Sequence, residues 1–281
     1  MKHPFLLVVL TFCVFSQYSF SQEEIKSQEK YTAHNKGKFY ISWGGNRESF
    51  TESDVNFRGD NYNFTVENMR AHDKPKGWHV DYINPTRMTI PQTDFRLGYY
   101  ISDHYSISVG WDHMKYVMSQ YQLANVTGYI STGEEYDGAY YQTPTVMTED
   151  FLTYEHTDGL NYVNAEFSRH DDFSKWLGIT NTDIIQFNFS EGLGAGVLYP
   201  KTNTKLMGRE RHDEFHVSGY GLSGKMALNI TFLKHFYVQA ELKSGYINMQ
   251  DIRTTYNGTD RASQDFFFFQ RIIEVGGIFR I

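Results

Sequence analysis

The sequence predicts an all-β chain that folds as an antiparallel, up-and-down transmembrane β-barrel with eight strands and long extracellular loops. Three observations support this fold class. The chain begins with an export signal, it combines many aromatic residues with a polar mean hydropathy, and apolar and polar residues alternate in stretch after stretch. Such alternation is typical of strands that show one face to lipid and the other to a polar lumen.

The N-terminus has the pattern of a secretory signal peptide. A short basic start precedes an apolar run from Phe5 to Phe15, which is too short to cross a bilayer as a helix. Ser19 and Ser21 place small residues at the −3 and −1 positions that signal peptidase requires, so we expect cleavage after Ser21. The sequence therefore divides into a signal peptide (1–21), a flexible periplasmic segment (22–36) and an outer-membrane barrel domain (37–281).

Composition excludes several classes of protein. Cys13 is the only cysteine and lies within the signal, so the mature chain has no disulfide, no thiol nucleophile and no cysteine-ligated zinc. A net charge of −7 without a basic stripe argues against a nucleic-acid partner. The 22 Phe and 21 Tyr are more than a soluble globule normally uses. A soluble β-sandwich or ligand-binding barrel would give a similar alternation and remains the alternative.

Eight stretches with a period of two are expected as strands. The clearest hairpin joins Phe95–Ile101 to Tyr105–Trp111 through the short turn Ser102–His104. Short and long connections alternate along the chain, and outer-membrane barrels keep the short turns on the periplasmic side. The expected strands cover residues 37–48, 88–101, 105 onward, 151–168, 183–199, 215–231, 236 onward and 265–281, and the expected outer loops cover 49–87, 119–150, 201–214 and 251–264. Extra hairpins in the first two loops would raise the strand number to ten or more.

The chain ends in an amphipathic segment, Val275 to Ile281, with aliphatic or aromatic residues at alternate positions. Together with the signal peptide and the eight strands, this end resembles the small outer-membrane β-barrel family of Gram-negative bacteria, although the usual last residue is Phe. The resemblance implies a location in the cell outer membrane, insertion by the barrel-assembly machinery, and contact with outer-membrane lipids and lipopolysaccharide. It implies no particular activity.

The alternation also places charged residues of both signs in the lumen. An eight-stranded barrel is only wide enough for side chains to fill it, so we expect these residues to form a hydrogen-bonded polar plug. A narrow gated channel or a proton path is the functional alternative. The residues expected in this luminal network are Asp94, Arg96, Asp112, Glu166, Glu241, Lys243, Glu274 and Arg280.

Two motifs suggest chemistry. His156 and Asp158 at the rim have the ligand types of an oxygen and nitrogen metal site, although solvated loop anchors use the same residues. His216 and Ser218 resemble the His-x-Ser pair of outer-membrane lipid A deacylases and phospholipases, but Gly219 stands where those families have Asn. No cofactor motif is present in the sequence.

We therefore expect a non-enzymatic outer-membrane protein that stiffens the envelope or binds an external ligand at its loops. The outer loops are rich in Tyr and Asn, which suit adaptable recognition. Two alternatives remain at this point: a narrow channel or transporter for small apolar compounds, and a lipid A or phospholipid acyl hydrolase that uses His216 and Ser218.

Overall fold

The computed structural model describes residues 34–75, 92–209, 211 and 214–281, all within one compact unit, Thr32–Ile281. The predicted signal peptide and residues 22–33 of the predicted periplasmic segment lie outside the described residues, as do residues 88–91 of the expected second strand. In the part of the chain that is described, no helix has both the length and the apolar character needed to cross a bilayer.

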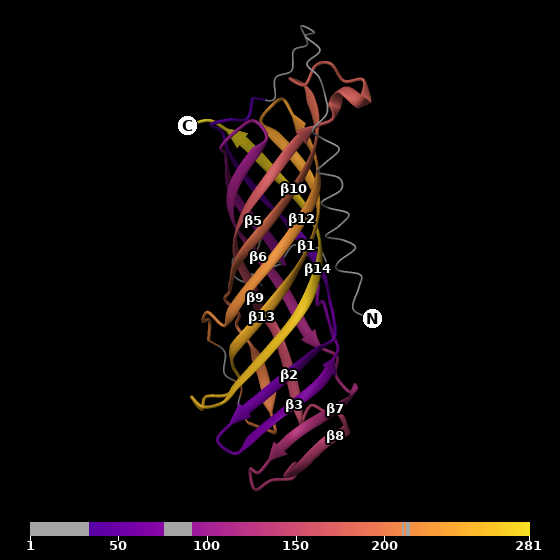
Figure 1. The fold of residues 1–281 in the computed structure, drawn as a ribbon, viewed down its shortest axis with the longest axis vertical. Helices are drawn as coiled ribbons and strands as arrows, with labels where there is room; N and C mark the ends of the chain where they lie inside the picture. Colours follow the sequence, from indigo (N-terminus) through magenta and orange to yellow (C-terminus); the bar gives the residue numbers. More distant parts are fainter. Residues whose placement is uncertain (1–33, 76–91, 210, 212–213) are drawn as a thin grey trace, which may run out of the picture. The chain divides into compact units, whose positions relative to one another are not determined.

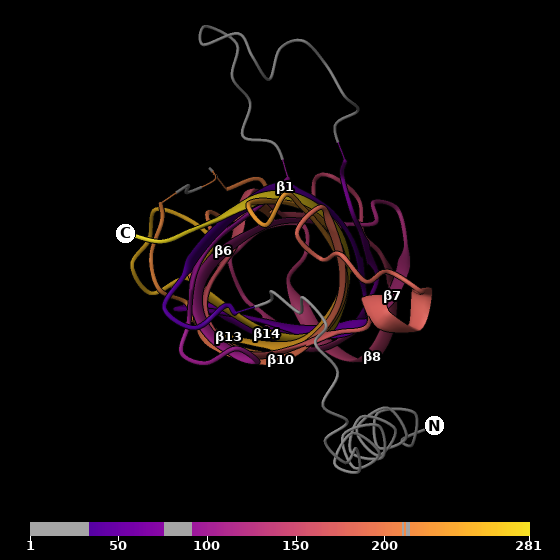
Figure 2. The ribbon, with the colours of Figure 1, turned by 90° about the horizontal axis from the view of Figure 1, so that it is seen from above.

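Eight antiparallel strands form a closed ring (Figures 1 and 2). Along the ring they follow the order of the chain, and the last strand pairs with the first from Phe39 opposite Phe279 to Phe50 opposite Phe268. The strands are β1 (Phe39–Phe50), β5 (Thr93–Tyr100), β6 (Tyr105–Met118), β9 (Leu152–Asp172), β10 (Ile185–Leu198), β12 (Gly219–Phe232), β13 (Phe236–Arg253) and β14 (Arg261–Phe279). This ring confirms the predicted fold class.

The connections at one end of the ring are short, as expected. Residues 101–104 join β5 to β6, and Leu233–His235 joins β12 to β13. The connection from β9 to β10 holds a single 3₁₀ turn, η2 (Ser174–Leu177). We call the end of the barrel that carries these three connections the short-turn end, and we call the opposite end the projecting end.

The connections at the projecting end contain further strands. The outer part of β14 pairs with β2 (Ser53–Gly59), and the sheet continues through β3 (Tyr62–Met69) and β7 (Leu123–Ile130) to β8 (Gly138–Val146). Two shorter strands, β4 (Ala71–His72) and β11 (Asn203–Leu206), pair with β6 and β9. The extra strands therefore lengthen the barrel beyond its ring (Figure 1) and leave the ring with eight strands.

The outward face of the ring is apolar. Trp43, Val109, Leu193 and Ile273 come from different strands, and between 56% and 69% of each is exposed. Exposure of apolar surface over a whole ring of strands is unfavourable in water but suits contact with the hydrocarbon of a bilayer. Because the ring is closed, its backbone groups are paired without a free edge, as a membrane requires.

The interior has two layers. Toward the short-turn end the inward side chains are mostly polar or charged, apart from a small cluster around Tyr40 and Ile278, whereas at the projecting end they form an apolar core. Phe57 on β2 and Phe64 on β3 stack with ring centroids 5.4 Å apart, and Tyr154 on β9 meets Phe57 edge-on at 5.7 Å. The projecting end is therefore packed like the interior of a soluble domain, rather than open as a pore mouth.

Candidate functional site: the charged lumen

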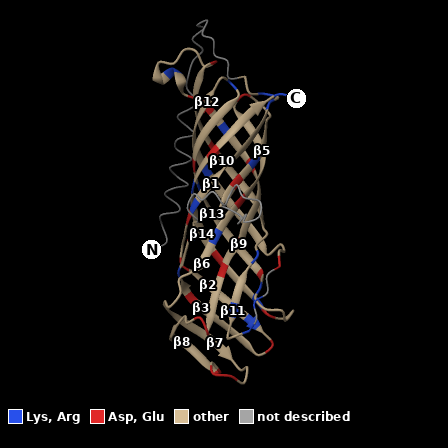
Figure 3. Cartoon of the chain, turned by 180° about the vertical axis from the view of Figure 1, so that it is seen from behind, with Lys and Arg blue, Asp and Glu red and all other residues tan. Residues whose placement is uncertain are grey.

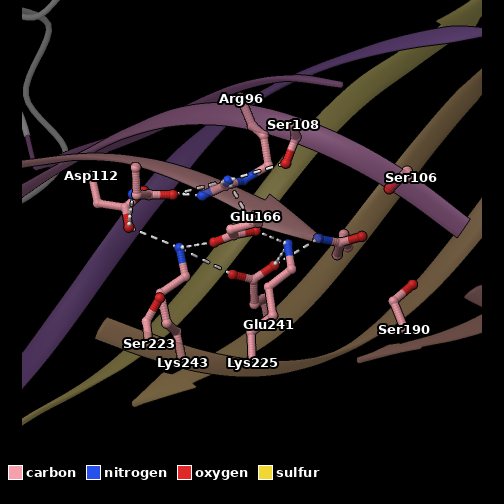
Figure 4. Close-up of polar contacts among 12 residues, drawn as sticks. Arg96, Ser106, Ser108, Asp112, Glu166, Ser190, Ser223, Lys225, Glu241 and Lys243 are labelled. Carbon is pink, nitrogen blue, oxygen red and sulfur yellow. Dashed lines mark hydrogen bonds and ion pairs between the residues drawn. The ribbon is translucent and has the colours of Figure 1, made fainter. Parts of the chain in front are cut away.

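Six charged side chains meet inside the ring (Figure 4). Three are cationic and three are anionic, and all are at least 94% shielded from solvent. Five strands contribute them: Arg96 from β5, Asp112 from β6, Glu166 from β9, Lys225 from β12, and both Glu241 and Lys243 from β13. Among these six residues the formal charges cancel.

Every member of the cluster has at least two partners of opposite sign. Lys243 Nζ lies 2.8 Å from Asp112, 3.1 Å from Glu166 and 3.5 Å from Glu241. Lys225 Nζ lies 2.7 Å from Glu166 and 3.1 Å from Glu241. Burial of ions is tolerable only when Coulombic attraction and hydrogen bonds replace the lost water, and this arrangement supplies both.

Arg96 connects two of these carboxylates, Glu166 and Asp112. Its Nη1 lies 2.9 Å from Glu166 and its Nη2 lies 3.3 Å from Asp112. Asn164 bridges Arg96 and Asp112, because it accepts a hydrogen bond from Arg96 at 3.2 Å and donates one to Asp112 at 3.1 Å. The guanidinium group thus connects three neighbouring strands, β5, β6 and β9, on the inner face of the ring.

Glycines opposite the cluster give it room. Gly110 is the cross-strand partner of Arg96, and a methyl group at that position would lie 2.6 Å from the guanidinium. Gly194 is the partner of Glu166, and a methyl group there would lie 2.9 Å from the Glu166 side chain. Larger residues at these two positions would displace the charged groups from their contacts.

The structure places the predicted luminal residues as follows. Asp94 accepts a hydrogen bond from Asn46 at 2.6 Å, and Glu274 accepts one from Gln239 at 3.2 Å, so both lie beside the central six. Arg280 does not join them: β14 ends at Phe279, and the exposed Arg280 side chain donates instead to the backbone oxygen of Lys36 at 2.9 Å. The sequence analysis missed Lys225, which has the inward parity of Ser223.

A narrow polar cavity lies between the charged cluster and the short-turn end. Its lining includes Lys38, Tyr40, His170, Gln186 and Asn229, and it has room for only a few water molecules. Acidic and basic residues are interspersed along the barrel and do not form a continuous track of one sign (Figure 3). The lumen is thus filled over most of its described length by side chains that bind one another.

The residues considered for a metal do not converge. His156 is fully buried and its Nδ1 lies 2.8 Å from the hydroxyl of Thr202. Asp158 is about half exposed and reaches toward Lys201 at 3.9 Å. Gly159 adopts a φ of 148°, and this local irregularity ends the parity that would have kept both side chains on one face. Among the described residues, no three His, Asp or Glu side chains are arranged to hold a metal.

The His-x-Ser pair is not joined by a hydrogen bond. The Nε2 of His216 lies 2.5 Å from the backbone oxygen of Asp251, and its Nδ1 faces the backbone oxygen of Glu214 at 3.4 Å. Ser218 is buried, and its hydroxyl makes no hydrogen bond. A histidine that activates a serine must face that hydroxyl, so this geometry differs from that of a nucleophile and its base.

No family model and no curated protein matches the sequence. Solved structures that are similar include the outer membrane protein OprG from Pseudomonas aeruginosa, at 10% identity, with 88% of this chain and 98% of that chain covered and a TM-score of 0.36. The outer membrane protein AlkL is 9% identical, with 93% of this chain and 98% of that chain covered and a TM-score of 0.39. The outer membrane protease OmpT from Escherichia coli is 8% identical, with 92% of this chain and 100% of that chain covered and a TM-score of 0.35. At these identities the likeness concerns the fold alone, and it assigns no activity to this chain.

Proposed function

We propose that this chain is a non-enzymatic outer-membrane protein with a closed lumen that binds an external ligand through its projecting end. The observation that carries the proposal is the outward face of the hairpin formed by β7 and β8. Leu123, Tyr129, Tyr141 and Val146 lie in this hairpin and are 63%, 49%, 84% and 46% exposed. Exposed aromatic and aliphatic side chains on one face of an element are typical of recognition surfaces.

The hairpin is firmly held, which supports a role in recognition. Ala124, Val126 and Ile130 on the other face of β7 are buried in the apolar core, and β7 pairs along β3. A ligand that binds a preformed surface loses less conformational entropy than one that must order a loop. The outward side chains are therefore presented by a rigid element.

The free edge of β8 is poorly suited to accept another strand. Pro144 lacks a backbone donor, Gln142 has a positive φ of 50°, and the pairing of β7 with β8 shifts register between Val126 and Gly128. Such features block the addition of a further strand at an edge. They favour recognition through side chains over recognition through strand addition.

The lumen gives little support to transport. A small apolar compound would have to pass both the packed aromatic core and the cluster around Lys243, and it could not replace the ion pairs that it displaced. The hydrolase alternative is not supported, because no hydrogen bond joins His216 to Ser218. Surface binding is the function that the described geometry supports best.

We expect the double substitution Tyr129→Ser and Tyr141→Ser to weaken binding of external ligands about tenfold or more, because aromatic anchors commonly dominate such interfaces. The measurement compares purified wild-type and variant barrels on an array of glycans and extracellular proteins. Trp176→Ser is the matched control, since this ring is 82% exposed at the opposite end of the barrel. A wild-type protein that binds no array member, or a double variant that binds equally well, would refute the proposal.

A further inference from the structure

Two arginines face outward on neighbouring strands of the ring. Arg47 on β1 and Arg271 on β14 are direct cross-strand partners. Both share the outward parity of Trp43 and Ile273, which are exposed on the same strands. Like charges directly opposite each other on one face destabilise a strand pair, so the arrangement calls for an anion between them.

The position of the pair along the strands places it near the edge of the apolar band. Phe39 and Phe279 are cross-strand partners at the short-turn end, with ring centroids 6.2 Å apart, and each arginine lies eight residues farther along its strand. At about 3.4 Å per residue and a tilt of about 40°, eight residues rise roughly 21 Å. The band of a membrane barrel is about 25 Å tall, so the guanidinium groups reach the headgroup level on the projecting side.

No acidic partner neutralises the pair within the described residues. The outward positions beside it are Gly45 and Ser49 on β1, Phe269 and Ile273 on β14, and Leu242 on β13. The Nη1 of Arg47 donates to a backbone oxygen, that of Asn46, at 2.7 Å.

Three other arginines of the projecting end have carboxylate partners. Arg253 lies 2.7 Å from Glu214, Arg261 lies 2.7 Å from Asp251, and Arg209 lies 3.2 Å from Asp260. Acids are therefore present at this end of the molecule, but among the described residues none forms an ion pair with Arg47 or Arg271.

We propose that Arg47 and Arg271 bind the phosphate groups of lipid A, the phosphorylated glycolipid of the outer leaflet. Guanidinium groups match phosphate oxygens through paired hydrogen bonds, and a bound phosphate would convert the repulsion of the two cations into a bridge. The apolar side chains of Leu242 and Ile273 lie beside the pair, on the side where acyl chains would pack. The proposal requires the outer-membrane location proposed above, but neither the closed lumen nor the hairpin surface.

The test measures the affinity of purified protein in detergent micelles for lipid A. Each of Arg47→Gln and Arg271→Gln should weaken binding about fivefold, and the double variant about thirtyfold, because one basic residue near a membrane surface contributes on the order of such a factor. Arg253→Gln removes an arginine of the same end that is already paired with Glu214. Because its charge is already neutralised, this variant should change the affinity less than about twofold.

Three further probes identify the lipid. Lipid A stripped of its phosphates should bind the wild type as weakly as native lipid A binds the double variant. Phosphatidylglycerol should bind more weakly than lipid A, and inorganic phosphate should not compete. Equal affinity for native and dephosphorylated lipid A, or equal affinity of wild type and double variant, would show that the arginines do not bind the phosphates and are only solvated by water. Equal affinity for phosphatidylglycerol would overturn the assignment to lipid A.

Folding is checked separately by the heat-dependent mobility of each variant on gels. If the double glutamine variant fails to fold, the single variants and the charge-conserving pair Arg47→Lys and Arg271→Lys decide the outcome. The lysine pair should retain much of the affinity while losing the paired hydrogen bonds. A wild-type protein that fractionates outside the outer membrane would refute the proposed location, whereas unchanged affinities in a correctly located protein refute only the lipid site.

Discussion

Replacing Lys243 with methionine should lower the free energy of unfolding by about 3–5 kcal/mol, the cost of removing one partner from a buried ionic cluster. Lys243 is 1% exposed and contacts three carboxylates, those of Asp112, Glu166 and Glu241. Methionine has a similar length but no charge, so Asp112, Glu166 and Glu241 would each lose one buried counter-ion. Urea titration of the protein in lipid vesicles, followed by tryptophan fluorescence, measures the change.

Lys234→Met is the control for this substitution. Lys234 lies at the short-turn end and pairs with Asp183 at 2.9 Å, but both side chains are substantially exposed. Exposed pairs contribute about 0–1 kcal/mol, so this variant should unfold nearly as the wild type does. If the two lysine variants lost the same stability, the lumen would have to be wet enough to solvate the three carboxylates.

Leu228→Arg should destabilise the barrel by about 2–4 kcal/mol, because the outward face at mid-height meets hydrocarbon. Leu228 is 55% exposed on β12 and lies four residues from Phe232 at the short-turn end of that strand. An arginine there can reach water only by a long extension across the apolar band. The same urea titration in vesicles reports the change.

Leu233→Arg introduces the same side chain in the turn after β12. Leu233 is 61% exposed in the connection at the short-turn end, where the new charge would meet water and headgroups. This variant should stay within about 1 kcal/mol of the wild type, as surface substitutions usually do. Equal tolerance of arginine at both positions would mean that the apolar face does not meet lipid.

The sequence was sufficient to predict the ring because a period of two assigns each residue to a face. Ile41 and Trp43, for example, alternate with Tyr40 and Ser42, and the structure exposes the first pair and buries the second. The strands of the projecting end were harder to recognise, although Val55 and Phe57 alternate with polar residues in the same way. Their inward faces pack in the apolar core of the projecting end, and the residue pattern of a single strand does not predict which other strands share that core.

The contacts of the charged lumen could be predicted only in part. Parity identifies which charges point inward, but register decides which of them meet, and register depends on turn lengths and bulges across the whole sheet. Lys225 lies beside Glu166 only because β10 separates β12 from β9 with a particular stagger. Asp158 and Arg280 were misplaced for local reasons: an irregular residue at Gly159 in one case and the end of β14 in the other.

Electrical recording on the purified wild-type protein decides whether the lumen is closed. The protein is inserted into a planar lipid bilayer in concentrated salt, and current is recorded at fixed voltage. We predict no steady conductance above that of the bare bilayer, because the cluster around Lys243 and the aromatic core around Phe57 and Phe64 fill the path. A stable conductance that scales with salt concentration would contradict the closed lumen and favour a channel.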